Sequence, residues 1–216
     1  MTLRELLRGL SERKDGYLLV HQAGVCFYAD MLVQEVAPRL RPVVLTAAAY
    51  HDVGKALLPD NLLFKDGDLT PEEWKYVRLH PVSGADLLKR GILGEAWQNG
   101  SWEQVVLAVR HHHERWDGSG YPDGIKEEKI PLAARIIALA DAYDAMTTDR
   151  PYRRALSRET ALKRIVESAG TQFDPNLAQI FVKTLSSLED RNLRDQLADF
   201  SAKFSYPDLG RWAASG

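Results

Sequence analysis

Histidines and aspartates inside otherwise apolar segments are the residues of this sequence whose types and spacing point most directly to chemistry. His51 and Asp52 directly follow an uncharged run of eight residues, 43–50, and Lys55 stands one turn further on. A buried carboxylate costs several kcal/mol unless it is paired. Asp52 therefore needs a cation or a donor network, unless the helix simply ends there and both residues face water.

A second cluster is the histidine triplet at positions 111–113. The helix predicted from Trp102 has apolar residues at positions 102, 105, 106 and 109, and the same period places His112 and His113 on its buried face. His111 lies about 100° round the helix, on another face. Two adjacent inward imidazoles are unusual in a core, because each carries a donor and an acceptor that need partners. The pair therefore favours metal binding.

The other candidate ligands are weaker when each is taken alone. Asp141 and Asp144 share a helix face beside the apolar run 136–140, unless Asp141 lies on the solvated face of an amphipathic helix. His80 is expected at the end of a helix, before Pro81, where it could equally be exposed, and His21 follows an apolar triplet.

Together these imidazoles and carboxylates come from five predicted helices and exceed what one ion can coordinate. Two ions that share a bridging carboxylate would use such a set economically. Imidazole-rich ligation suits Fe, Mn, Ni, Co or Zn better than Mg or Ca. Two-metal sites commonly serve hydrolysis at phosphorus.

The elements that must position these residues are predicted to be helices throughout. Thr70, Pro71 and Glu73 form a helix start with a capping box, and Ser157 and Asp174 are expected N-caps of later helices. Alternating strand patterns are scarce, so the predicted class is all-α. The remaining expected segments are a helix over 17–40 that stops or bends near the prolines at 38 and 42, a buried helix over 43–50, helices over 102–113 and 132–146, and a glycine-rich loop over 117–124.

Length and composition limit the remaining choices. The 216 residues are 45% hydrophobic and 27% charged, which fits a globular domain and excludes disorder throughout. A net charge of −2 gives no general attraction to DNA, RNA or an acidic membrane. The single cysteine, Cys26, fits a reducing compartment. With neither a secretory signal nor an uninterrupted apolar span in the sequence, a cytoplasmic protein without a membrane span is expected.

The motifs resemble one known family. His51-Asp52 with Lys55, followed by the block His112–Pro122 (HHERWDGSGYP), is similar to the HD-GYP domains, a branch of the HD metal-dependent phosphohydrolases. Further segments match in order: 69–74 with His80-Pro81, 141–145, 149–153 and 170–175. The resemblance implies a compact HD-type helical bundle with a binuclear metal site over 17–216. Residues 1–16, with leucines at 3, 6, 7 and 10, are expected to form an N-terminal helix or linker.

The resemblance also implies an activity: hydrolysis of cyclic di-GMP to pGpG, GMP or both, through attack of a metal-bridging hydroxide. Two divalent ions are expected, Fe or Mn first and Ni, Co or Zn as alternatives. Some relatives place a glutamate where Tyr17 stands and hold a third metal with it, so two ions rather than three are expected here. The implied metal ligands are His21, His51, Asp52, His80, His112, His113 and Asp141, with Asp52 bridging.

Substrate contacts follow from the same resemblance. Asp52 and Lys55 are the expected catalytic residues, and Lys55 also contacts the scissile phosphate. The other implied substrate-binding residues are Gly120, Tyr121, Pro122, Arg150 and Arg153. The two arginines open a cationic run that also includes residues 154 and 158.

Other readings of the same residues remain open. A receptor that binds a nucleotide with little turnover, and a hydrolase of another cyclic dinucleotide or nucleotide, are the alternative functions. Expected partners are cyclic di-GMP, diguanylate cyclases or other signalling proteins, and a second copy of the chain.

Overall fold

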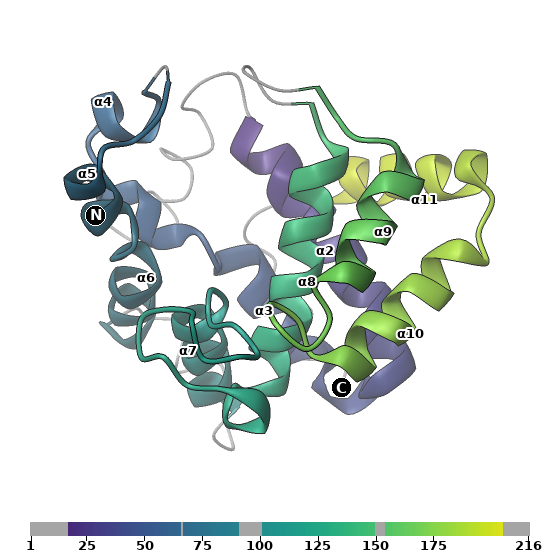
Figure 1. Ribbon diagram of the computed structural model, residues 1–216, viewed down its shortest axis with the longest axis horizontal. Helices are drawn as coiled ribbons and strands as arrows, with labels where there is room; N and C mark the ends of the chain where they lie inside the picture. Colours follow the sequence, from purple (N-terminus) through teal and green to yellow (C-terminus); the bar gives the residue numbers. More distant parts are fainter. Residues whose placement is uncertain (1–16, 66, 91–100, 150–153, 205–216) are drawn as a thin grey trace.

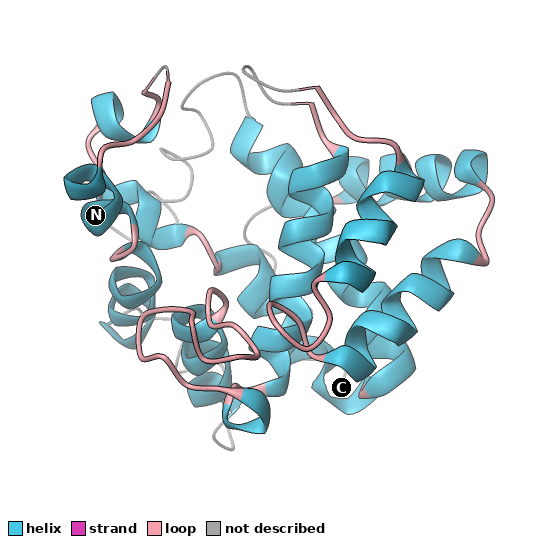
Figure 2. Cartoon of the chain, in the orientation of Figure 1, coloured by secondary structure: helices cyan, strands magenta, loops and turns pink. Residues whose placement is uncertain are grey.

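The computed structural model describes residues 17–65, 67–90, 101–149 and 154–204, with side chains from residue 20 onward, and this part of the chain is helical (Figure 2). It contains no strand, as the all-α prediction requires. The elements are α2 (Tyr17–Val36), η1 (Pro38–Leu40), α3 (Arg41–Tyr50), η2 (Val53–Leu57), α4 (Asp60–Leu63), α5 (Pro71–Val77), α6 (His80–Arg90), α7 (Ser101–His111), η4 (Glu127–Lys129), α8 (Leu132–Thr147), α9 (Arg158–Glu167), α10 (Pro175–Ser186) and α11 (Asp190–Lys203).

Three helices form the centre of the bundle. Helix α2 packs against both α3 and α8, and α3 also contacts α7 and α8 (Figure 1). Every residue of α3 from 43 to 50 is buried, as the uncharged run predicts. Helices α4 to α7 lie on one side of this centre, and α9, α10 and α11 lie on the other. None of the described helices is both long enough and apolar enough to cross a membrane.

The predicted helix starts are confirmed by hydrogen bonds. Thr70 accepts from the amide of Glu73, and the Glu73 side chain accepts from the amide of Thr70, which completes the capping box of α5. The side chains of Ser157 and Asp174 accept amide hydrogen bonds at the starts of α9 and α10. These local signals were sufficient because each bond joins residues only two or three positions apart.

Two predicted helix ends are wrong. His80 does not end the capped helix: α5 stops at Val77 and His80 begins α6, with Pro81 in its first turn. Proline is tolerated there because the first amides of a helix have no intrahelical acceptor. Helix α7 ends at His111 instead of continuing to 113, and the amide of Glu114 closes a turn on the His111 carbonyl. The predicted N-terminal segment, residues 1–16, lies outside the described residues.

Candidate metal centre

Three histidines are oriented by carbonyl groups at helix ends. The Nδ1 atoms of His51, His80 and His112 each donate to the carbonyl oxygen three residues earlier, at 2.7 Å. Those carbonyls lie in the last turns of α3, α5 and α7, where no amide of the same helix is available to them. Donation through Nδ1 leaves the Nε2 lone pair of each ring free, which is the form that binds metal ions.

His21 is oriented by a carboxylate instead. Its Nδ1 donates to Asp144 Oδ2 at 2.6 Å, and its Nε2 lies 3.3 Å from Asp141 Oδ1. Burial lowers the pKa of His21, but the two carboxylates outweigh burial and raise that pKa to about 9. Without metal the ring therefore carries a proton on each nitrogen at pH 7, and an ion bound at Nε2 would replace the proton there. The carboxylate on Nδ1 would then fix the ring and strengthen Nε2 as a ligand.

The approach of Asp144 to His21 depends on a glycine in α2. A Cβ atom at Gly24 would lie 1.9 Å from Asp144 Oδ1 and 2.8 Å from its Cγ. Asp144 is only 3% exposed, so its carboxylate has little freedom to move away. Gly24 therefore provides the space in which Asp144 contacts His21.

The structure brings all seven predicted ligands together in two groups. Within each group, one potential ligand atom per residue lies within 4.8 Å of the corresponding atoms of the others. The four-residue group consists of Asp52, His80, His112 and His113, and the three-residue group consists of His21, His51 and Asp141.

Asp52 faces both groups. Its Oδ1 lies 3.3 Å from His80 Nε2, and its Oδ2 lies 3.5 Å from His51 Nε2. Lys55 lies 2.5 Å from the same Oδ2 through its Nζ. Burial raises the pKa of Asp52, but Lys55 and His51 outweigh burial and hold that pKa well below its usual value. The carboxylate is therefore ionised, with its two oxygens directed to different groups.

The donor set fits divalent transition ions. His51 Nε2 and Asp52 Oδ1 are buried without a hydrogen-bond partner, a costly arrangement that a cation would relieve. Burial, together with the neighbouring His80, lowers the pKa of His113 to about 3, and burial beside His113 lowers the pKa of His112 well below its usual value. Both rings are therefore neutral at pH 7 and keep their lone pairs. Neutral imidazoles with two or more ionised carboxylates suit Fe, Mn, Co, Ni or Zn.

The glycine-rich loop 117–124 reaches the four-residue group through Tyr121. The Tyr121 ring stacks on His113 with centroids 4.9 Å apart and an interplanar angle of 29°. Gly120 packs directly on backbone: a Cβ there would lie 2.3 Å from the amide nitrogen of Arg115. The Tyr121–Pro122 peptide bond is cis. Of the three predicted loop contacts, Tyr121 is thus adjacent to the predicted ligands and Gly120 has a packing role.

Glu114 and Asp123 anchor this loop. Glu114 is 3% exposed, and its Oε1 accepts from the amides of Asp123 and Gly124 at 2.7 and 3.0 Å. Asp123 receives two hydrogen bonds from Arg110 and one from His111 at 2.8 Å. His111, which the helix period separates from the predicted ligands, is therefore buried in an ion-paired anchor. Its group with Glu114 and Asp123 already contains the Arg110 cation, so we assign it no metal.

Comparison with known proteins decides the family. A family model described as an HD domain matches residues 25–177. The chain belongs to the HD domain family. A solved cyclic GMP-AMP-specific phosphodiesterase from Vibrio cholerae has a related fold: its TM-score is 0.59 at 19% identity, and the match covers 90% of this HD-domain chain and 48% of that chain.

Curated relatives agree with this assignment. A cyclic di-GMP phosphodiesterase from Thermotoga maritima is 35% identical over 201 residues, which cover 91% of this HD-domain chain and 52% of that protein. A 3′3′-cGAMP-specific phosphodiesterase 2 from Vibrio cholerae is 29% identical over 187 residues, which cover 84% of this chain and 35% of that protein. The chain spans about half the length, or less, of these relatives. The predicted resemblance to HD-domain phosphohydrolases is confirmed at the level of the HD domain family.

Some predicted contacts of this HD domain are outside the described residues or are wrong. Arg150 and Arg153 lie outside the described residues, as does the side chain of Tyr17. Arg158, counted in the same cationic run, bonds instead to Asp190 and to the carbonyl of Leu188. Arg158 therefore joins α9 to α11, and its guanidinium is not directed to the predicted substrate site.

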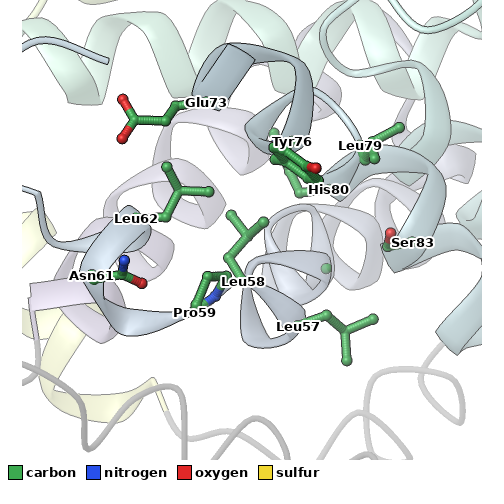
Figure 3. A pocket seen from close by; sticks show the side chains of 11 residues that line it. Leu57, Leu58, Pro59, Asn61, Leu62, Glu73, Tyr76, Leu79, His80 and Ser83 are labelled. Carbon is green, nitrogen blue, oxygen red and sulfur yellow. The ribbon is translucent and has the colours of Figure 1, made fainter. Parts of the chain in front are cut away.

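A cavity of about 430 Å³ adjoins the HD domain's predicted ligands at His80 (Figure 3). Leucines of η2 and α4 line it on one side, and Tyr76 and Leu79 line it on the other. The lining includes His80 and Gly54 but neither Asp52 nor Lys55. The cavity therefore lies beside the four-residue group, which it meets at His80.

Proposed function

We propose that this HD domain is a metal-dependent phosphodiesterase of cyclic dinucleotides, with cyclic di-GMP as its first candidate substrate. One observation carries the proposal: seven ligands gather in two groups, and the buried Asp52 directs one oxygen to each. The curated relatives are named for hydrolysis of cyclic di-GMP and of 3′3′-cGAMP, which gives the substrate class.

The proposed metal ligands are the two groups themselves, with Asp52 shared between them. Two divalent ions held there would activate water and act as Lewis acids toward a phosphodiester. The orientation of His51, His80 and His112 by helix-end carbonyls keeps their Nε2 atoms fixed before any ion or substrate arrives. Such preorganisation removes the cost of arranging ligands during the reaction.

Lys55 supplies the proposed contact to the scissile phosphate. Its ammonium lies against Asp52, and its side chain is 24% exposed, so it is held in place yet accessible. A phosphoryl oxygen near Asp52 would meet this cation as negative charge develops. Tyr121 forms one wall of the same space through its stack on His113. We further propose that Arg150 and Arg153 bind substrate phosphate.

The test is turnover by the whole chain after loading with Mn²⁺ or, without oxygen, with Fe²⁺. Cyclic di-GMP and 3′3′-cGAMP are each incubated with the protein, and linear products are separated by chromatography. We expect linear dinucleotide from at least one of them and none from Asp52→Ala. Binding without product would favour the receptor alternative, and near-normal turnover and metal content in Asp52→Ala would refute the proposed centre.

A further inference from the structure

Arg78 is an exposed cation beside the metal centre that the sequence motifs do not single out. It directly follows α5 and stands two residues before His80. Its guanidinium carbon lies over the Tyr121 ring, 5.2 Å from the centroid. Because that ring also stacks on His113, a single aromatic ring separates Arg78 from a predicted metal ligand.

Tyr121 also lies among the charges of the site. Burial raises the pKa of the Tyr121 hydroxyl, the carboxylates of Asp52 and Asp141 raise it further, and Arg78 lowers it. Tyr121 is thus close enough to the two ligand groups and to Arg78 for each to act on it. The guanidinium therefore lies on a ring that itself contacts the four-residue group.

Arg78 also differs from the other cations near the site in its partners. Lys55 is bound to Asp52, and Arg110 is bound to Asp123. Within residues 17–65, 67–90, 101–149 and 154–204, no carboxylate lies within ion-pair distance of Arg78. Stacking on an aromatic ring orients a guanidinium while leaving its N–H groups available. Arg78 is thereby prepared to receive an anion.

We propose that Arg78 binds the phosphate of a cyclic dinucleotide that is not being cleaved. This inference rests on the proposed function. The two phosphates of such a ring are joined through a ribose on either side, so when one phosphate lies at the ligand groups the other lies about one sugar away. The Tyr121 ring contacts both residues: its centroid lies 4.9 Å from that of His113 and 5.2 Å from the Arg78 guanidinium carbon. A planar guanidinium with two N–H groups in parallel is the side chain best matched to a phosphate.

The test compares a substrate with two phosphates and a substrate with one. Wild type, Arg78→Ala and Arg78→Lys are assayed with cyclic di-GMP and with bis(p-nitrophenyl) phosphate, which has a single phosphodiester. A charge-assisted hydrogen bond is worth about 1.5–3 kcal/mol, so Arg78→Ala should raise KM for cyclic di-GMP about 10- to 150-fold. Arg78→Lys should recover part of this loss, and the loss with the small diester should be much smaller.

Lys75→Ala is the matched control. Lys75 is exposed and lies in α5, the helix that Arg78 directly follows, and the structure pairs it with Glu72 at 3.8 Å. We expect its KM for both substrates, and the metal content of all variants, to equal those of wild type. An unchanged KM for cyclic di-GMP in Arg78→Ala would overturn the proposal. So would equal losses with both substrates, because Arg78 would then act only by holding Tyr121.

Binding separates a failure of this inference from a failure of the proposed function. A phosphorothioate analogue of cyclic di-GMP is titrated calorimetrically into Mn²⁺-loaded protein. Weaker binding by Arg78→Ala than by wild type and Lys75→Ala supports the inference even if wild type hydrolyses neither substrate. Equal binding by all three proteins overturns it whatever the turnover.

Discussion

Replacing Gly24 by alanine should destabilise the protein, although the same change in the middle of most helices stabilises it. Alanine is favoured over glycine in a helix by about 1 kcal/mol. Here the added Cβ would lie 1.9 Å from Asp144 Oδ1. Overpacking costs about 1–3 kcal/mol, and loss of the charge-assisted bond from His21 to Asp144 costs about 1.5–3 kcal/mol. After the helix gain, the net loss should be about 1.5–5 kcal/mol.

The Asp144→Ala background provides the control for this prediction. The three atoms nearest to the added Cβ all belong to the Asp144 carboxylate, so removing that carboxylate removes the close contact. In this background Gly24→Ala should stabilise the protein by up to about 1 kcal/mol. The sign of the effect should therefore reverse between the two backgrounds.

Urea unfolding of the four metal-free proteins measures the change, and competition with a chelator measures Mn²⁺ affinity. Loss of a carboxylate that orients a ligating histidine typically costs 10–100-fold in metal affinity, so Gly24→Ala and Asp144→Ala should each show about that loss. Equal destabilisation by Gly24→Ala in both backgrounds would refute the close contact as its cause. A neutral effect in wild type would show that Asp144 has room to move and is not fixed against His21.

Three further predictions concern the loop, a helix cap and the metals. Glu114→Ala should lower the free energy of unfolding by about 3–6 kcal/mol, because two amide hydrogen bonds to a buried carboxylate are lost. Glu114→Gln keeps an acceptor and should cost much less; urea unfolding tests this, and equal costs would contradict it. Ser157→Ala removes the N-cap of α9 and should lower the free energy of unfolding by about 1 kcal/mol, with kcat and KM unchanged. A lower kcat in the folded variant would contradict the placement of α9 away from the site. Removing metal with a chelator should lower Tm by about 5–10 °C, as expected when an ion at 100 times its Kd is withdrawn from a domain of this size; calorimetry with and without chelator tests this, and an unchanged Tm would contradict tight binding by the two groups.

The parts of the fold that could be predicted depend on short-range signals. The cap formed by Thr70 and Glu73 joins neighbours in the chain, and the buried helix over 43–50 is recognisable because it lacks any charge. The helical period was less reliable at the end of α7. It extended the helix through His113, but the helix stops at His111 and a turn presents the next two side chains.

The contacts that complete the site could not be predicted because they join distant segments. The sequence places Asp144 on one face with Asp141, but its bond to His21 spans 123 residues and requires the packing of α2 on α8. Arg78 meets Tyr121 only because α5 and the glycine-rich loop approach the same group of ligands. The cationic run in the sequence also gave a wrong role for Arg158, because its partner Asp190 lies in another helix and is distant in the sequence.

Anomalous X-ray diffraction from crystals of the Mn²⁺-loaded chain tests the central claim most directly, because it locates each ion without reference to activity. The account predicts two manganese peaks, one at His80, His112 and His113 and the other at His21, His51 and Asp141, with one Asp52 oxygen on each ion. A single peak, or two peaks of which only one contacts Asp52, would contradict it.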